Sequence, residues 1–270
     1  MNKKKSLALF FTLNFSVRAW HRDGSLKREI DIYKKELENY EKIYWLTYDQ
    51  GDQEFQHLLP KNIVILPKKK NIDNFIYSFK MADYYSDVLK ECSVFKTNQM
   101  NGSWAAVIAK KKYGKHLFVR TGFTQSLDLI CKHKTVSKNY LKYRLAESYA
   151  YRNADSASVS SQAQYDYIKR RYNPKGMKLI PNMINTKLFK PTEKENNLSN
   201  IKELLYVGRL DYVQKNVKNL IKSLRGIDNI RLTMIGKGKW DEKSWLTKFA
   251  AKNNIKLKIL DRVPNEKLPG

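Results

Sequence analysis

Short apolar runs alternate with amphipathic runs along most of this chain, and no other feature restricts its fold as strongly. The apolar runs cover residues 7–15, 43–48, 63–66, 94–97, 117–121 and 157–160. Apolar residues recur at every third or fourth position in residues 26–40, 72–85, 104–112, 140–153 and 162–171. We expect the first set to be buried strands and the second to be helices, with a loop at residues 16–25. Strands that alternate with helices at these lengths pair in parallel, so the pattern predicts a doubly wound α/β sheet.

The alternation stops near Pro181 and starts again after residue 200. Residues 192–200, with the sequence TEKENNLSN, are polar and without period, which predicts a linker. Beyond it we expect strands at 204–207, 231–235 and 255–260 and helices at 216–224 and 241–253. This organisation predicts a first domain at residues 1–191, a linker at 192–200 and the first part of a second domain at 201–270. About 70 residues are fewer than the ~100 to 150 of a typical α/β domain, so we expect the second domain to be incomplete.

The charge of the chain restricts its partners. The 270 residues include 52 Lys and Arg but only 26 Asp and Glu, which gives a formal net charge of +26 at pH 7. A hydrophobic content of 42% is too high for a disordered basic tail, so we expect a folded protein with an anionic partner. A non-catalytic protein that binds membrane or nucleic acid remains an alternative, because charge alone would suffice for it. We expect no nucleic acid, because the positive charge is dispersed and no helix-turn-helix or aromatic RNA-binding motif is present.

The cysteine and histidine residues form no recognisable metal or disulfide pattern. Cys92 and Cys131 make no CxxC pair, and the histidines are far apart without HxxH spacing. This excludes a zinc finger and argues against a disulfide framework. We therefore expect a reduced cytosolic chain without a metal site.

The N-terminus begins like a secretory signal, because lysines at positions 3–5 precede the apolar run 7–15. Thr12 and Asn14 interrupt that run, however, and no small-x-small cleavage site follows. We interpret the run as the first buried strand. No other stretch approaches the ~18 apolar residues of a membrane span, so we expect any membrane contact to be peripheral.

Residues 206–216, with the sequence YVGRLDYVQKN, combine a strand end, a glycine and two cations. Gly208 allows a tight turn after the strand, and Arg209 and Lys215 flank the start of the next predicted helix. Such a junction suits a diphosphate, because helix N-termini carry free N–H groups and partial positive charge. The alternative is that these are ordinary surface charges of a basic protein. The residues alone leave both interpretations open.

The longer run LLYVGRLDYVQKNVKNLIKSL, followed by LTMIGKG and LKILDRVPNEKLP, resembles the start of the C-terminal domain of glycosyltransferase family 4. The resemblance extends to LIPNMINTKLFKP, which is similar to an interdomain PNG-type motif of that family, and to VSSQAQYDYIKRRY before it. KTNQMNGSW and FVRTGF resemble segments of members that build surface polysaccharides. The family resemblance implies the GT-B fold, with two Rossmann-like domains of doubly wound parallel sheets.

The resemblance also assigns site residues. In the family an Arg after the Gly and a Lys six positions later hold the donor diphosphate, which gives the catalytic roles to Arg209 and Lys215, since 215 − 209 = 6. The implied substrate-binding residues are Gly24, Arg120, Asn182, Gly208, Gly236 and Gly238. The chain departs from the family pattern with Asn216 and Met183 in place of glycines, and with Arg120 where many members have His. The family's acidic E-x7-E pair has no counterpart in residues 201–270, which makes a truncated, inactive transferase a further alternative.

The implied reaction moves a sugar, with retention of configuration, from a nucleoside-diphosphate sugar to a saccharide or lipid-linked acceptor. The resemblance implies a hexosyltransferase in cell-surface polysaccharide synthesis, with no metal and no cofactor besides the donor substrate. Basic residues near an anionic leaflet contribute ~1 kcal/mol each, so the net charge favours an anionic membrane surface as a further partner. We expect a cytoplasmic protein that is peripheral on the inner face of the cell membrane.

Other candidate residues have simpler interpretations. Gly236 and Gly238 could also form an ordinary turn at a strand end. Lone carboxylates on a basic chain are usually surface ion-pair partners, and aromatic residues are usually core or interface. We therefore interpret three carboxylates as surface ion-pair partners, namely Asp128, Glu147 and Asp261. We interpret four aromatic residues as core or interface, namely Trp20, Trp45, Trp104 and Tyr140.

Overall fold

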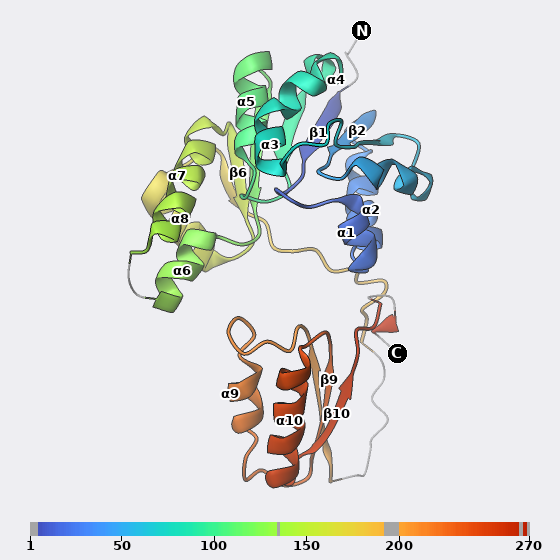
Figure 1. Cartoon of the computed structure of the whole chain (residues 1–270), viewed down its shortest axis with the longest axis vertical. Coiled ribbons are helices and arrows are strands. Elements are labelled where there is room, and N and C mark those ends of the chain that lie inside the picture. The colour runs from blue at the N-terminus through green and yellow to red at the C-terminus, as the bar shows by residue number, and fades with distance from the viewer. Residues whose placement is uncertain (1–4, 134–135, 192–199, 265–266, 269–270) are drawn as a thin grey trace. The chain divides into compact units, whose positions relative to one another are not determined.

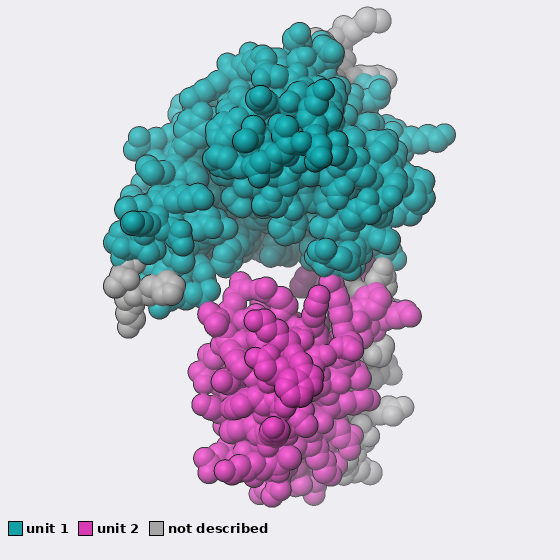
Figure 2. Space-filling view, in the orientation of Figure 1, with its two compact units in different colours: residues 1–183 teal, residues 184–270 magenta. Residues whose placement is uncertain are grey.

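A parallel sheet organises the first of two units in the computed structural model, which describes residues 5–133, 136–191, 200–264 and 267–268. The chain divides into residues 1–183 and 184–270, called unit 1 and unit 2 here (Figure 2). Residues 192–199 of the predicted linker lie outside the described residues. Figure 1 shows the α/β elements of each unit.

The sheet of unit 1 has the order β3-β2-β1-β4-β5-β6-β7, and all neighbouring strands are parallel. Its strands are β1 (Ser6–Phe10), β2 (Lys42–Leu46), β3 (Ile63–Leu66), β4 (Val94–Thr97), β5 (His116–Thr121), β6 (Ser156–Val159) and β7 (Met177–Leu179). The helices are α1 (Val17–Arg22), α2 (Leu26–Glu36), the 3-10 helix η1 (Gln50–Leu58), α3 (Asn74–Tyr84), α4 (Ser86–Glu91), α5 (Trp104–Tyr113), α6 (Gln125–His133), α7 (Lys138–Asn153) and α8 (Gln162–Tyr172). The doubly wound α/β prediction is confirmed.

The predicted strands form because the central sheet is covered on both faces. Leu9, Trp45 and Phe95 lie on three neighbouring strands and are fully buried. Strands buried on both faces are continuous apolar runs, which is why the sequence reveals them. Trp20 and Tyr140 are also buried as expected, whereas Trp104 is half-buried.

The predicted loop at residues 16–25 is wrong, because it contains helix α1. The Ser16 hydroxyl caps this helix by accepting a hydrogen bond from the Ala19 N–H at 3.0 Å. The buried Asp52 carboxylate accepts bonds from the N–H groups of Val17 and Arg18, both at 2.9 Å. Asp52 lies more than thirty residues away on η1, so no local pattern around α1 contains this stabilising contact.

Unit 2 has a smaller parallel sheet of order β10-β9-β8 in its described residues. Its elements are β8 (Lys202–Val207), α9 (Val217–Lys222), β9 (Ile230–Ile235), α10 (Trp240–Lys252) and β10 (Lys256–Leu260). Leu232, Met234 and Leu246 are buried in a core of its own. Leu205 and Val207 on β8 stay 63% and 49% exposed, so this strand is incompletely covered, as expected.

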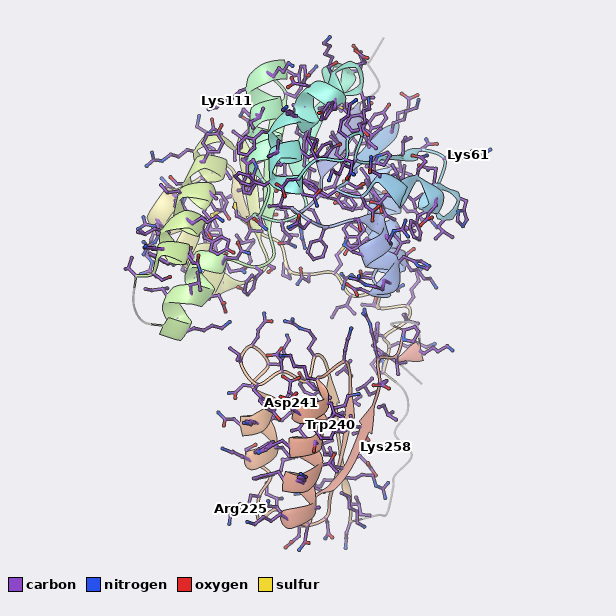
Figure 3. The ribbon with its side chains drawn as sticks, viewed as in Figure 1. Lys61, Lys111, Arg225, Trp240, Asp241 and Lys258 are labelled. Atoms are coloured by element: carbon purple, nitrogen blue, oxygen red, sulfur yellow. The ribbon has the colours of Figure 1, made fainter. Side chains whose placement is uncertain are left out.

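Positive charge is spread over both units. Lys61 and Lys111 of unit 1 and Arg225 and Lys258 of unit 2 are all exposed (Figure 3). Among the helices of the described residues, none combines the length and the apolarity needed to cross a bilayer.

Candidate functional site

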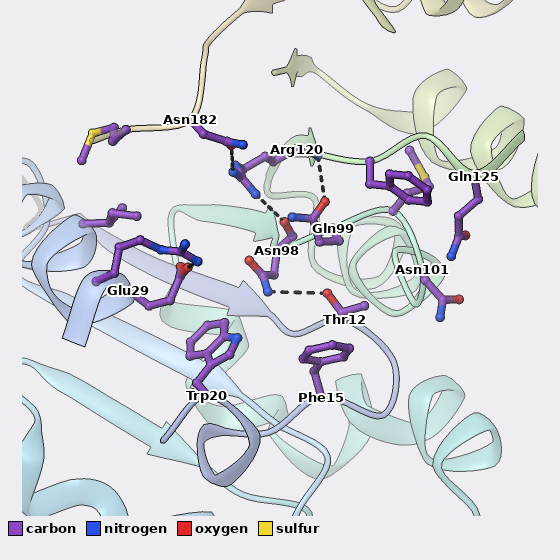
Figure 4. A pocket seen from close by; sticks show the side chains of 16 residues that line it. Thr12, Phe15, Trp20, Glu29, Asn98, Gln99, Asn101, Arg120, Gln125 and Asn182 are labelled. Atoms are coloured by element: carbon purple, nitrogen blue, oxygen red, sulfur yellow. Dashed lines mark hydrogen bonds and ion pairs between the residues drawn. The ribbon is translucent and has the colours of Figure 1, made fainter. Parts of the chain in front are cut away.

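The carboxyl ends of β1, β4 and β5 border a cavity of about 410 Å³ in unit 1 (Figure 4). Strand order reverses between β1 and β4, because β2 follows on one side of β1 and β4 pairs on its other side. The connections after these two strands diverge, which leaves a crevice at the carboxyl edge, the usual ligand position in such sheets. The cavity therefore lies where the topology of the sheet predicts a binding site.

Arg120 and Asn182, two of the residues implied by the resemblance, meet at this cavity. The Arg120 guanidinium donates from Nη1 to the Asn98 carbonyl and from Nη2 to Asn182 Oδ1, both at 3.1 Å (Figure 4). The Arg120 backbone N–H donates to Thr97 Oγ1 at 3.0 Å. Arg120 is thus held at the end of β5 with its charged group at the cavity wall.

Amide and aromatic side chains form much of the remaining lining. Gln99 Oε1 accepts a bond from the Gly122 N–H at 2.7 Å, which leaves the Gln99 amino group for other partners. The other amides and the aromatic residues of the lining are Asn98, Asn101, Gln125, Asn182, Phe15, Trp20 and Phe123. Amides both donate and accept, so they suit the hydroxyl groups of a saccharide. Sequence reasoning missed Gln99, Asn101 and Gln125, although the polar run NQMN directly after a predicted strand was a usable signal.

Gly24 lies away from the cavity. It forms an exposed turn between α1 and α2, with φ 60, and does not belong to the cavity lining. The loop after β1 instead brings Thr12 and Phe15 to the cavity, and Asn14 in that loop has φ 66. Gly24 therefore does not belong to this cavity, although the resemblance implies a substrate-binding role for it.

Gly208, Gly236 and Gly238 come together at the carboxyl ends of β8 and β9 in unit 2, and we call them the glycine cluster. The Gly208 N–H donates to the Ile235 carbonyl at 2.9 Å. A Cβ atom on Gly236 would lie 1.8 Å from the Gly208 carbonyl oxygen, and one on Gly238 would lie 2.8 Å from the Cβ of Leu210. Only glycine fits this packing, so the turn at the strand end is tightly built.

Arg209 and Lys215 belong to the loop that leaves the glycine cluster. Asp211 organises this loop, because its Oδ1 accepts from the N–H groups of Gln214 at 2.6 Å and Lys215 at 3.0 Å. Partial burial acts to raise the pKa of Asp211, but these donors and the Arg209 charge hold it below its ordinary value. The Arg209 side chain is 64% exposed and lies 3.8 Å from Asp211 Oδ2, and Lys215 is exposed. Asn216 takes a left-handed conformation, φ 52, which preserves the turn where the family pattern has glycine.

The expected surface role of Glu147 is wrong, whereas Asp128 and Asp261 do form exposed ion pairs, with Lys132 and Lys243. Glu147 is buried and accepts bonds from Ser126 Oγ at 2.5 Å and Tyr172 OH at 2.8 Å. Burial raises the pKa of Glu147, and these hydrogen bonds oppose the rise. Hydroxyl donors from α6 and α8 compensate for the burial of Glu147 on α7, and no sequence spacing reveals them.

Metal ligands do not gather in the described ranges, where no group of three or more His, Cys, Asp or Glu side chains could hold an ion. No protein-family model matches the chain, and no curated protein has a significantly similar sequence.

Solved structures are similar to the chain in fold. The sucrose-phosphate synthase from Thermosynechococcus elongatus has a TM-score of 0.67 and 15% sequence identity, and the match covers 98% of this chain and 72% of the synthase chain. The lipopolysaccharide outer core galactosyltransferase WaaB has a TM-score of 0.61 and 20% identity, with 96% and 68% covered. HepE from Anabaena, in complex with UDP and glucose, has a TM-score of 0.62 and 15% identity, with 95% and 69% covered. These neighbours are GT-B glycosyltransferases, so the chain has the GT-B fold, and the fold implied by the family resemblance is confirmed.

Proposed function

We propose that this protein is a retaining glycosyltransferase of the hexosyltransferase type, which moves a sugar from a nucleoside-diphosphate sugar to a saccharide or lipid-linked acceptor. The observation that carries this proposal is the glycine cluster of unit 2 with Arg209 and Lys215 in the loop that leaves it. Glycines let a diphosphate approach the backbone, and guanidinium and ammonium groups bind phosphate oxygens. HepE, which has the same fold, occurs in complex with UDP and with UDP-glucose, and this supports a nucleotide-sugar donor here.

The two cations would act on the leaving group. As the bond between the sugar C1 and the diphosphate oxygen breaks, negative charge develops on the diphosphate and positive charge on the sugar. Arg209 and Lys215 are in place before that charge develops, so they stabilise the transition state more than the ground state. The acceptor oxygen bonds to C1 on the face that the diphosphate leaves, and the acceptor hydroxyl proton passes to the departing diphosphate oxygen. The two cations neutralise the charge that develops on the diphosphate and so take the place of a metal ion, and we propose no metal and no cofactor besides the donor.

The cavity of unit 1 is our candidate for the acceptor site. Its amides offer donors and acceptors to sugar hydroxyls, and Phe15, which is 43% exposed, offers an apolar face to the sugar C–H groups. A saccharide acceptor fits this lining. Cell-surface polysaccharide synthesis is the process that the upstream sequence segments suggest.

We also propose that the protein contacts an anionic membrane surface through an aromatic surface made of Phe75, Ile76, Phe79 and Trp104. The first three are 50%, 51% and 46% exposed. The Phe75 and Phe79 rings lie 5.0 Å apart, and the Phe79 and Trp104 rings lie 6.2 Å apart. Exposed Lys80 follows Ile76 by one helical turn on α3. Aromatic rings prefer the membrane interface and lysines prefer anionic headgroups, so this surface suits a cytoplasmic leaflet.

The aromatic surface is connected to the cavity of unit 1. Asn74, next to Phe75, donates from Nδ2 to Asn14 Oδ1 at 2.9 Å, and Asn14 precedes the cavity residue Phe15. Trp104 begins the helix that follows Asn101, another cavity residue. A membrane at this surface would lie close to the cavity, which supports a lipid-linked acceptor and a peripheral location on the inner face of the cell membrane.

The proposed function is tested by incubating the full chain with UDP-, GDP- and ADP-linked hexoses and a bacterial lipid extract. We expect release of one nucleoside diphosphate together with a glycosylated product, detected by mass spectrometry, and both should form ~10²-fold or more slowly in Arg209→Ala. Proton NMR of the anomeric proton shows whether the product has the same anomeric configuration as the donor sugar, which tests retention. Failure to transfer any of the sugars would contradict the proposal.

A further inference from the structure

The charged side chains at and behind the cavity of unit 1 leave one cation without a carboxylate. Arg28 pairs with Glu29 at 2.8 Å, and both line the cavity. Behind them, Lys96 on β4 pairs with Glu36 on α2 at 3.2 Å. The remaining charge is that of Arg120, which has no ion pair with any carboxylate in the part of the chain that the structure describes.

The two partners of Arg120 are neutral. Its guanidinium donates to the Asn98 carbonyl and to Asn182 Oδ1, which uses two of its five N–H groups. Burial is the larger cause of the lowered pKa of Lys96 and Glu36 opposes the change, but Lys96 also lies close enough for the Arg120 charge to lower that pKa. A half-buried guanidinium held by neutral partners lacks the compensation that such a group usually has, and a ligand anion would supply it.

We propose that the cavity binds an acidic saccharide, whose carboxylate or phosphate oxygens lie on Arg120 and whose hydroxyls lie on the surrounding amides. The fork of N–H groups on a guanidinium matches two oxygens of one oxyanion, which a lysine does not do. This inference rests on the proposed function only in naming the acidic saccharide as the acceptor. Binding of the anion is a property of the cavity alone.

The test compares the affinities of three sugars: D-glucose, D-glucuronate and D-glucose 6-phosphate. The full chain carries Arg209→Ala and Lys215→Ala, so that the cations of unit 2 do not bind phosphate, and affinities are measured by saturation-transfer NMR. We expect an acidic sugar to bind at least about tenfold more tightly than D-glucose, the scale of a charged hydrogen-bonded pair. Preference for glucuronate over glucose 6-phosphate, or the reverse, identifies the anion as carboxylate or phosphate.

Three added variants locate the effect. Arg120→Gln should remove the preference, while Arg152→Gln removes the same charge from an exposed position of α7 and should preserve it. Asn182→Ala breaks the contact of Arg120 with residue 182 but retains the charge, so it should also preserve the preference. If Arg120→Gln fails to fold, Arg120→Lys takes its place and should show a weakened preference, because it retains the charge without the fork.

Several outcomes would overturn the inference. These are equal affinity for the three sugars, binding of none of them, a preference that survives Arg120→Gln, and loss of the preference in Asn182→Ala. The unmodified chain separates this failure from failure of the proposed function. Transfer of sugar by the unmodified chain to neutral saccharides but not to acidic ones would overturn the acidic acceptor and leave the glycosyltransferase proposal intact.

Discussion

The side chains of Arg209 and Lys215 are exposed and contribute nothing to the core of unit 2, so their removal separates function from stability. In Arg209→Ala and in Lys215→Ala we expect the transfer rate to fall by ~10²-fold or more, the scale of losing one preorganised charge donor. Initial rates at saturating donor measure this. Lys222→Ala, an exposed lysine at the end of α9, is the matched control and should retain the rate. Wild-type rates in both test variants would refute the diphosphate role.

Glu147 predicts a pH dependence of stability. Burial raises its folded pKa above the ordinary value of 4.5, so its contribution is complete below the unfolded pKa and is lost as pH rises through the folded pKa. Glu147→Gln resembles the protonated form at every pH. We therefore expect the melting temperature of this variant, relative to wild type, to increase between pH 4 and 7 in thermal unfolding followed by circular dichroism. If the difference in melting temperature between Glu147→Gln and wild type does not change with pH, ionisation of Glu147 does not destabilise the fold.

The site residues differ in how far sequence could identify them. The spacing of Arg209 and Lys215 lies within one local motif, and the structure finds both in one loop. Arg120 and Asn182 are separated by 62 positions, and their contact depends on β5 and the segment after β7 reaching one edge of the sheet. Gln99 and Gln125 become cavity residues through the same topology. Long-range juxtaposition of this kind is absent from any local pattern.

At the scale of helices and strands, continuous apolar runs were sufficient for β1, β2 and β3, because strands covered on both faces have no polar side. The runs that predicted β4, β5 and β6 are interrupted by Lys96, Arg120 and Ser158. Helix α1 was missed because its N-terminal N–H groups bind Asp52 on η1, a contact between distant segments. Strand β7 was missed as well. It has only three residues, two of them exposed, and so lacks an apolar signature.

The aromatic surface on α3 and α5 predicts a membrane contact that one pair of substitutions removes. Phe75→Ser combined with Phe79→Ser should weaken binding to vesicles containing phosphatidylglycerol by at least about tenfold. The reason is that the double variant lacks two half-exposed rings whose transfer from water into the membrane favours binding. Cosedimentation measures this binding. Leu58→Ser, which alters a 42% exposed apolar residue of η1, should bind like wild type. If the double variant binds as tightly as Leu58→Ser, the aromatic surface is not the membrane contact. Equal binding of the wild-type chain to anionic and to neutral vesicles would exclude an anionic membrane surface as its partner.

At the scale of the whole molecule, the buried residues form two separate hydrophobic clusters, one in each unit. Separate cores favour separate unfolding, so we expect two calorimetric transitions. Leu246→Ala, at a fully buried position of α10, should destabilise unit 2 by ~2 to 5 kcal/mol and shift only the transition of that unit. One cooperative transition that shifts as a whole in Leu246→Ala would refute this division.

Binding of a nucleoside diphosphate at the glycine cluster of unit 2 is the central claim, and amide NMR tests it most directly. The full isotope-labelled chain is titrated with UDP and with GDP. We expect one of them to shift the backbone amides of residues 208–216 and 236–238, and Arg209→Ala with Lys215→Ala to abolish the shifts. If neither nucleotide perturbs these amides, or if the double variant responds like wild type, unit 2 does not bind a sugar donor through this loop and the proposed reaction is contradicted.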